Sequence, residues 1–271
     1  MDGMNMEEET MRPFMTIAFC LLCGWLSAND STLPTTLFLP LDTGRKIEIR
    51  AVQHASVVMK ISTETMILVD PVGNRKQYPS LTAHALIIYT HDHYDHFNTA
   101  LLRSLASTSP SAQILAPRCM RSKIPGELAN RCHFITPNEA WRWNDVTIHA
   151  VPAYNVSRGK LQFHPRQKGY VGYIVEIGTK RIYFSGDTEV LPDKKTAGQI
   201  DLAFVCMNLP WTMDAKRAFA EVKKLAPRQV CPYHYRNRDN TFSERDAFIR
   251  MFRQSSLPGI ELRLLDFYSR H

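Results

Sequence analysis

The stretch HDHYDH, residues 91–96, concentrates three of the chain's ten histidines and two aspartates in six positions. The apolar run ALIIY, residues 85–89, precedes it and predicts a short buried strand. Apolar residues at helical spacing follow over residues 99–106. The polar stretch is therefore expected to form a loop between a buried strand and a helix, where side chains can converge from an irregular backbone.

Four side chains of this loop are of the kind that binds metal ions, namely His91, His93, Asp95 and His96. Neutral imidazoles and carboxylates are good ligands for Zn²⁺, Mn²⁺ or Fe. Without a cation, the cluster would crowd like charges whenever the histidines take up protons, and metal binding removes that conflict. A solvated polar loop is the alternative, but it does not account for so many histidines at the end of one strand.

Two later motifs place similar side chains at other strand ends. Asp187 lies in SGDT, directly after a predicted strand over residues 181–184, and His234 lies in CPYHY, after a strand that ends near Cys231. Taken alone, Asp187 fits a turn and His234 fits a hydrogen-bonded core histidine. Taken together with the HDHYDH loop, they predict a shared metal site.

The chain has 271 residues, of which 44% are hydrophobic, enough for one large domain with a buried core. Strands are predicted over residues 47–61 (one or two), 65–70, 86–89, 113–116, 132–135, 201–207, 229–233 and 260–267, hairpins over 141–151 and 172–185, and helices over 99–106, 214–225 and 243–252. Both halves run from strands through a helix to strands, a pattern that two face-to-face sheets with outer helices would bury.

The formal net charge is +7, and the basic residues are mostly scattered. Nucleic-acid recognition would need a basic patch with aromatics or a known module, and none is visible. An anionic small-molecule substrate explains the excess equally well. No nucleic-acid partner is therefore expected, and the sequence leaves the oligomeric state open.

The N-terminal residues 1–28 are expected to be a signal peptide, because the short apolar run 14–28 follows Arg12 and ends in small residues. The acidic residues 7–9 depart from that pattern, and Met11 is an alternative start. This interpretation predicts an exported protein, periplasmic or secreted, with no stable membrane span after cleavage. The alternatives are an uncleaved anchor helix or a buried helix in a cytoplasmic protein.

Residues 29–45 are expected to form an extended lead-in, and residues 46–271 one domain, because no Pro/Gly/Ser-rich linker divides them. Four cysteines remain after residue 28, and they allow three pairings. Cys119 and Cys132 flank a polar segment and could bridge, whereas Cys206 and Cys231 lie in apolar runs and fit buried free thiols.

The motifs together resemble the metallo-β-lactamase superfamily. HDHYDH matches its HxHxDH signature, and GDT and PYHY match its later Asp and His motifs in order, so that the resemblance covers roughly residues 47–267. QHAS (53–56) and ILVDP (67–71) are similar to the metal-dependent hydrolase branch that includes ascorbate-6-phosphate lactonase. VPAYN (151–155), FHP (163–165) and TMD (212–214) resemble bacterial members of that branch.

The resemblance implies an α+β fold, a four-layer αββα sandwich, with two divalent metal ions at one edge. Zinc is the expected metal, with manganese or iron as alternatives. The first ion would be bound by His91 and His93, and the second by Asp95, His96 and His234. Asp187 would bridge both.

The chain departs from the family pattern at the third ligand of the first metal. Many members have a histidine where this chain has Ala153-Tyr154-Asn155. Asn155 could supply an amide oxygen, His164 could reach in from the next segment, or the first site could be weak or vacant. Asn155 and His164 are equally candidates for contacts with the substrate.

The activity implied is hydrolysis of an ester, lactone or phosphoester by a hydroxide held between cations about 3.5–4 Å apart. Asp95 would orient the nucleophile, and His54 is a candidate for substrate contact or leaving-group protonation, unless it is a core histidine. Arg236 follows a site motif and could receive an anionic group. The alternatives are a phosphodiesterase and a metal-binding protein of the same fold without hydrolytic activity.

Overall fold

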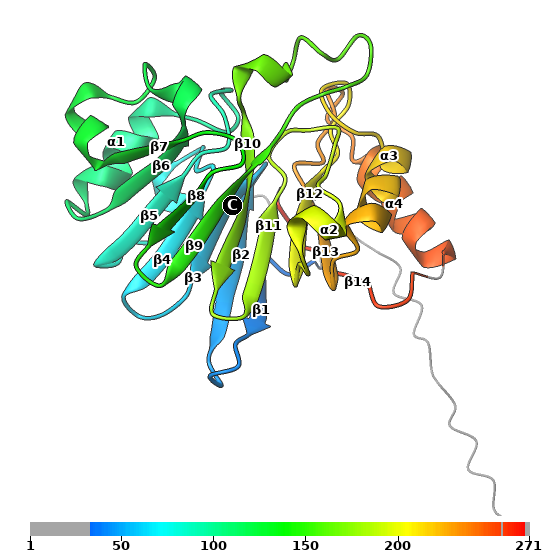
Figure 1. The fold of residues 1–271 in the computed structure, drawn as a ribbon, viewed down its shortest axis with the longest axis horizontal. Helices are drawn as coiled ribbons and strands as arrows, with labels where there is room; N and C mark the ends of the chain where they lie inside the picture. The colour runs from blue at the N-terminus through cyan, green and yellow to red at the C-terminus, as the bar shows by residue number, and fades with distance from the viewer. Residues whose placement is uncertain (1–32, 256, 269–271) are drawn as a thin grey trace, which may run out of the picture.

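The computed structural model describes residues 33–255 and 257–268, and it consists of two seven-stranded sheets packed face to face (Figure 1). The predicted signal peptide lies outside the described residues. The first sheet runs in the order β1 to β7, and the second in the order β14 to β8. Each half of the chain therefore builds one sheet.

The strands of the first sheet are β1 (Thr36–Pro40), β2 (Lys46–Gln53), β3 (Ser56–Lys60), β4 (Thr65–Val69), β5 (His84–Ile88), β6 (Gln113–Pro117) and β7 (Cys132–Ile135). Neighbours from β1 to β4 pair antiparallel, and neighbours from β4 to β7 pair parallel. The parallel strands β4, β5 and β6 are almost wholly apolar, as strands buried on both faces should be, whereas the edge strand β7 is only partly buried.

The second sheet has the same plan. Its strands are β8 (Ala140–Trp143), β9 (Val146–Pro152), β10 (Val171–Ile177), β11 (Lys180–Phe184), β12 (Leu202–Cys206), β13 (Gln229–Tyr233) and β14 (Glu261–Leu262). Pairing is antiparallel from β8 to β11 and parallel from β11 to β14. Because parallel strands end at a common edge, each sheet gathers the loops that follow its parallel strands on one side.

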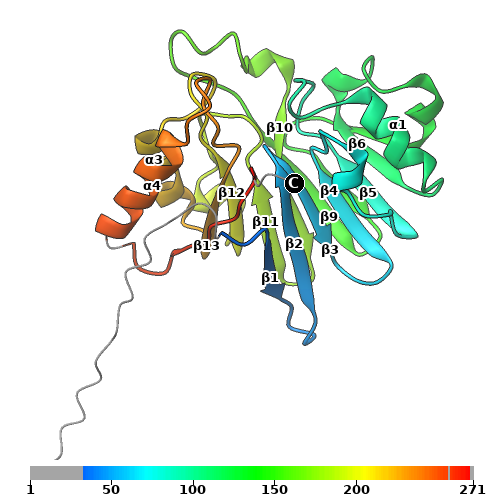
Figure 2. The same ribbon diagram turned by 180° about the vertical axis from the view of Figure 1, so that it is seen from behind.

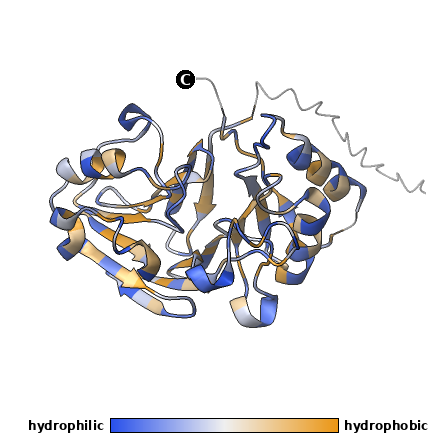
Figure 3. Cartoon of the chain, turned by 90° about the horizontal axis from the view of Figure 1, so that it is seen from above, coloured by the Kyte–Doolittle hydropathy of each residue, from blue (hydrophilic) through white to orange (hydrophobic). Residues whose placement is uncertain are grey.

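Helices cover the outer faces of the two sheets, which makes four layers (Figure 2). They are α1 (Thr99–Ser107) on the first sheet and α2 (Lys194–Ala197), α3 (Ala215–Leu225) and α4 (Ser243–Gln254) on the second, with short 3₁₀ turns η2 (Arg75–Gln77), η3 (Arg118–Met120), η4 (Gly126–Arg131) and η5 (Arg166–Lys168). Hydrophobic residues fill the space between the sheets, and hydrophilic residues lie on the outer helix surfaces (Figure 3).

The αββα prediction is confirmed. Helix α3 is capped by Asp214, whose carboxylate accepts a hydrogen bond from the backbone N–H of Arg217 at 2.7 Å. The closing strand predicted over 260–267 was wrong in length, because β14 has two residues. After Leu262 the chain leaves the sheet, and Leu265 and Phe267 fill the core instead. Strand β1 lies within the segment expected to be a lead-in and pairs with β2.

All four cysteines of the described chain are free. The bridge considered for Cys119 and Cys132 is not formed, and Cys206 and Cys231 are buried thiols as predicted. Within residues 33–255 and 257–268, no helix is long and apolar enough to cross a membrane.

Candidate metal centre

The predicted ligands meet at the edge of the sandwich where the parallel strands of both sheets end. Residues 91–96 follow β5 of the first sheet, whereas Asp187 follows β11 and His234 follows β13 of the second. The rings of His96 and His234, from different sheets, have centroids 4.7 Å apart. The structure therefore brings together side chains that lie 138 positions apart in the chain.

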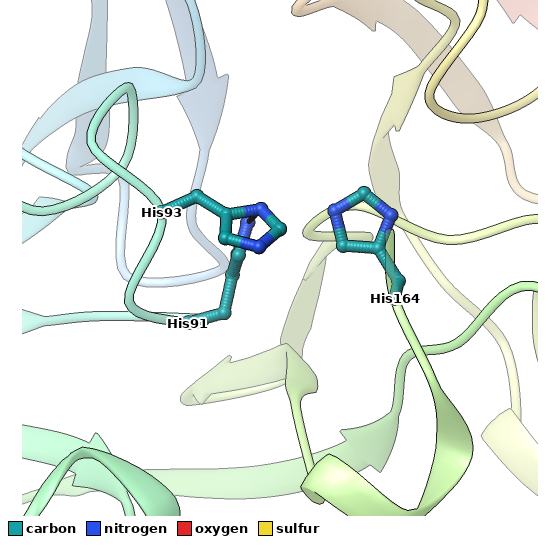
Figure 4. Close-up of side chains that lie close together, drawn as sticks. All are labelled: His91, His93 and His164. Carbon is teal, nitrogen blue, oxygen red and sulfur yellow. Dashed lines mark hydrogen bonds between the residues drawn. The ribbon is translucent and has the colours of Figure 1, made fainter. Parts of the chain in front are cut away.

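One group of ligand atoms belongs to His91, His93 and His164, whose imidazoles converge from two facing loops (Figure 4). The His93 ring centroid lies 4.6 Å from that of His91 and 4.9 Å from that of His164. One nitrogen from each ring lies within 4.8 Å of the others. Three converging imidazoles are a ligand set suited to Zn²⁺.

Two further groups extend the first, one through His91 and the other through His96. They consist of His91, His96 and Asp187, and of Asp95, His96 and His234. Nε2 of His234 lies 3.2 Å from a carboxylate oxygen of Asp95. The three groups form one continuous cluster, because His91 and His96 each belong to two of them.

Asp187 occupies the middle of this cluster. One of its carboxylate oxygens lies 3.4 Å from Nε2 of His164, and the other lies 3.3 Å from Nε2 of His96. The second oxygen is also 3.6 Å from Nε2 of His234. A single carboxylate thus faces the imidazoles of both outer groups, as a bridging ligand would.

Several buried atoms of the cluster have no hydrogen-bond partner, among them Nε2 of His96, Nε2 of His164 and Oδ1 of Asp187. An unsatisfied buried polar atom is costly, so such atoms are rare in native structures. Divalent cations bound in the groups described above would satisfy all three atoms. The residues present therefore fit a metal centre.

The electrostatics also suit cation binding. Burial holds the pKa of His91 well below its usual range and lowers the pKa of His164 to about 4, so both imidazoles are neutral near pH 7. Burial alone would raise the pKa of Asp187, but the His234 and His96 imidazoles hold it below its ordinary value. Neutral His91 and His164 beside an ionised Asp187 are in the protonation states in which such groups bind metals. Burial opposes the charge on His96, but the Asp187 and Asp70 carboxylates raise its pKa well above the ordinary value, so His96 must lose a proton when it binds a cation.

A residue missed by the sequence interpretation, Asp70, orients the cluster from below. This carboxylate is fully buried; one oxygen lies 2.8 Å from Nδ1 of His96, and the other accepts the backbone N–H of Thr90. The Thr90 hydroxyl donates to the first oxygen and lies 2.9 Å from Nδ1 of His91. Such outer partners fix ring orientation and raise the basicity of ligands. The signal was present, because Asp70 also follows a buried strand, β4.

Asn155, predicted as a ligand or a substrate contact, is bonded to the protein through its amide nitrogen, whereas its buried amide oxygen has no hydrogen-bond partner. Its amide nitrogen donates to the carbonyls of Trp211 at 2.7 Å and Lys160 at 3.0 Å, and it lies 3.3 Å from Nδ1 of His164. Of the alternatives considered, the one in which His164 completes the first group agrees best with this arrangement. Asn155 holds the His164 segment in place.

Glu189, which the sequence interpretation also missed, fixes the turn between Asn155 and His164. Its buried carboxylate accepts the backbone N–H groups of Val156 at 2.9 Å and Ser157 at 2.7 Å, and it lies 3.4 Å from the Lys160 ammonium. Glu189 follows Asp187 by two positions, so one strand end supplies both a candidate ligand and the anchor of the facing loop.

His54 and Arg236 lie beside the centre rather than in it. The His54 ring stands edge-on to His234 with centroids 5.5 Å apart, and its Nδ1 lies 3.4 Å from the Tyr268 hydroxyl. Burial lowers the pKa of His54 to about 3. The Arg236 guanidinium lies over the Tyr268 ring, 4.2 Å from its centroid. Both side chains are therefore held by Tyr268 next to His234.

Comparison with known proteins agrees with this geometry. Residues 65–235 match the family described as the β-lactamase superfamily domain. A UPF0173 metal-dependent hydrolase of Thermococcus onnurineus is 31% identical over 202 residues, which cover 70% of this chain and 84% of the relative. Another, from Thermus thermophilus, is 27% identical over 231 residues, which cover 80% of this chain and 96% of the relative.

Among solved structures, one from Parabacteroides distasonis, described as a candidate metal-dependent hydrolase, superposes with a TM-score of 0.69 at 26% identity. The match covers 85% of this chain and 99% of that protein. Sequence and fold thus point to one family, and the centre described above contains its histidine and aspartate motifs. The chain belongs to the β-lactamase superfamily and is one of its metal-dependent hydrolases.

Proposed function

We propose that the chain hydrolyses a small anionic ester, lactone or phosphoester, and that it uses two divalent cations for this purpose. His91, His93 and His164 would hold one ion, and Asp95, His96 and His234 the other, with Asp187 between them. The position of the Asp187 carboxylate, within 3.6 Å of imidazoles from both groups, is the observation that carries the proposal.

When bound, the cations would lower the pKa of water and so supply a nucleophile at neutral pH. The chain's own residues do the rest. Asp95 is placed to orient the water and accept its proton, because its carboxylate lies at the cluster and is only partly buried. Zinc suits a ligand set dominated by imidazoles, and manganese and iron suit it less closely.

Arg236 supports an anionic substrate. Its guanidinium is partly exposed and stacked on Tyr268. It could therefore bind a carboxylate or phosphate beside the centre without a large loss of side-chain freedom. His54, whose Nδ1 lies 3.4 Å from the Tyr268 hydroxyl, would contact the same part of a substrate. The resemblance to the branch that includes ascorbate-6-phosphate lactonase predicts a phosphorylated lactone as the anionic substrate, and this stays a prediction.

The test is a hydrolysis screen with lactone, ester and phosphodiester substrates on metal-loaded protein and on an Asp187→Ala variant. We expect the parent protein to hydrolyse one class of substrate and the Asp187→Ala variant to have lost this activity. The circular dichroism spectrum of the variant should match that of the parent, which would show that the fold is retained. Equal background rates in both would favour the remaining candidate, a metal-binding protein of this fold without hydrolytic activity.

A further inference from the structure

An open cavity lies on the outer face of the second sheet. Its volume is about 350 Å³, and it is bordered by β9, β10 and β11, by α2 and by the loop over residues 190–192. No α-helix of the described chain lies over β9 and β10, so this part of the sheet is left uncovered (Figure 1). A cavity of this size is at the lower end of the range for small-molecule sites in proteins.

The register of the strands shows that the cavity faces away from the space between the sheets. Tyr173 of β10 points inward, because its hydroxyl donates at 2.9 Å to the backbone carbonyl of Tyr89, which follows β5 of the first sheet. Since successive side chains of a strand point to opposite faces, Ile174 points outward. His149 of β9 lies directly opposite Ile174 and shares its face. Both Ile174 and His149 line the cavity.

The cavity is separate from the metal centre but is fastened to it. None of the candidate metal ligands is among the described residues that line the cavity. Tyr154 and Val190 do line it, and their backbone N–H groups both donate to the Thr188 hydroxyl oxygen at 3.1 Å. Thr188 directly follows Asp187, so the wall of the cavity is tied to the strand end that supplies this candidate ligand.

Two polar atoms of the lining residues lack a partner. Among the buried side-chain nitrogens of the described chain without a hydrogen-bond partner, those outside the metal centre are Nε of Arg181 and Nε2 of His149. Both residues line the cavity. The other guanidinium nitrogens of Arg181 are used, because Nη1 donates to the Glu176 carboxylate and Nη2 donates to the Ala197 carbonyl at 2.9 Å. Buried donors without an acceptor are costly and rare, so a ligand oxygen beside Arg181 would satisfy a donor that the protein leaves unpaired.

The charges around the cavity favour an uncharged ligand. Arg181 is the only Lys or Arg among the described residues that line it, and its charge is already paired with Glu176. The Glu176 carboxylate also lies 3.6 Å from Nε2 of His149, and Glu139 adds a second carboxylate at the exposed rim. A bound anion would therefore lie near two carboxylates without a free cation. The unpaired N–H of Arg181 disfavours a bound cation in the same way.

Most of the wall is apolar, and Val151, Ile174, Leu191 and Ala197 contribute to it. We propose that the cavity is a second binding site, which takes an uncharged, mainly apolar small molecule through a carbonyl or hydroxyl oxygen that accepts the Nε–H of Arg181. Such a molecule differs from the anionic substrate proposed for the metal centre. The inference therefore stands independently of the hydrolytic function, and its test requires no turnover.

The first test compares two probes of nearly equal size, acetophenone and benzoate, on the full, zinc-loaded chain. Acetophenone is uncharged and carries a carbonyl oxygen, whereas benzoate is an anion. Saturation-transfer NMR on the probes measures their binding. We expect acetophenone to bind more tightly than benzoate. Absence of acetophenone binding, or equal or tighter binding of benzoate, would overturn the proposal.

Arg181→Lys tests the donor, because lysine can keep the ion pair with Glu176 but has no N–H at the position of Nε. We expect the affinity for acetophenone to fall about tenfold, as for the loss of one hydrogen bond to a charged group. The affinity for ethylbenzene, which has the same shape but no oxygen, should stay the same. An equal change for both probes would overturn the role of the Arg181 donor.

A pair of substitutions on β9 tests the location. Val151 and Thr147 point to the same face of this strand, but of the two only Val151 lines the cavity. Both positions accept an aromatic residue in a strand. Val151→Phe should fill the cavity and abolish acetophenone binding, whereas Thr147→Phe should leave the binding unchanged. Binding that survives Val151→Phe, or that Thr147→Phe abolishes as well, would overturn the assignment to this cavity.

Crystals of the parent protein soaked in acetophenone show the occupant directly. We expect the ring to lie between β9 and α2, with the carbonyl oxygen within hydrogen-bond distance of Nε of Arg181. Density for water alone, for another segment of this chain or for a second copy over the same face would overturn the proposal.

Discussion

Asp70 shows how a buried residue with no predicted metal contact can control the centre. Its carboxylate lies 2.8 Å from Nδ1 of His96 and accepts the Thr90 hydroxyl, which in turn reaches His91. Without its charge, the imidazoles of His91 and His96 would also adopt the tautomer that carries the proton on Nε2, the nitrogen needed for the metal. Two of the candidate ligands therefore depend on one residue beneath them.

We predict that Asp70→Asn lowers zinc affinity by about 10-fold to 100-fold, the range seen when outer partners of ligands are changed. The measurement is competition with a chromophoric chelator. The same substitution at the half-buried Asp92 is not suitable as a control, because Asp92 accepts a hydrogen bond from the Tyr170 hydroxyl beside the histidines. Asp239→Asn, on a surface turn, is suitable and should leave the affinity unchanged.

A second prediction at this scale concerns His164 and pH. Its pKa is lowered to about 4 by burial, whereas in the unfolded chain it stays near 6.5. The unfolded state thus binds more protons as pH falls from about 6.5 to about 4, and the folded state loses stability over that window. The difference corresponds to roughly 3 kcal/mol for one histidine.

The check is urea unfolding in the presence of a chelator at several pH values between 4 and 7. His164→Gln should show a smaller loss of unfolding free energy on acidification than the parent protein. Parallel curves for the two proteins would mean that His164 is as accessible to protons in the folded state as in the unfolded one.

At the scale of elements, the segment over residues 153–164 decides whether the first group of histidines forms. This segment of the described chain contains no helix or strand. Its start is held by the hydrogen bond from the Asn155 amide to the Trp211 carbonyl, and the turn over 156–157 is held by hydrogen bonds to Glu189. His164 then meets His91 and His93 from the opposite side of the edge (Figure 4). The geometry of the first group is therefore set by a loop and its anchors.

We predict that Glu189→Gln weakens zinc binding at the histidine group more than at the group of Asp95, because a neutral amide accepts the two backbone N–H groups less strongly. Stepwise titration with Co²⁺, followed by its absorption spectrum, would separate the two events. An equal loss in both steps would indicate that the loop acts on the whole centre.

The sequence was most informative where polar motifs follow apolar strands, as for the HDHYDH loop, Asp187 and His234. Periodicity locates a strand, and its carboxyl end then locates the polar residue. The same rule would have found Asp70, which follows β4. It could not choose between Asn155 and His164, because their orientation depends on long-range contacts with Trp211 and Asp187.

At the scale of the whole molecule, the two halves of the chain each contribute one sheet and one side of the metal centre. The ligands from β5 and those from β11 and β13 meet only when both sheets are packed (Figure 1). A cation that needs ligands from both sheets can bind them together only in the folded state. Metal binding and the stability of the sandwich are therefore coupled.

The most direct test of this account is anomalous X-ray diffraction from crystals of the protein as purified, recorded on both sides of the zinc absorption edge. We predict two anomalous peaks, one among His91, His93 and His164 and the other among Asp95, His96 and His234, with the Asp187 carboxylate between them. A single peak, or peaks away from these side chains, would contradict it.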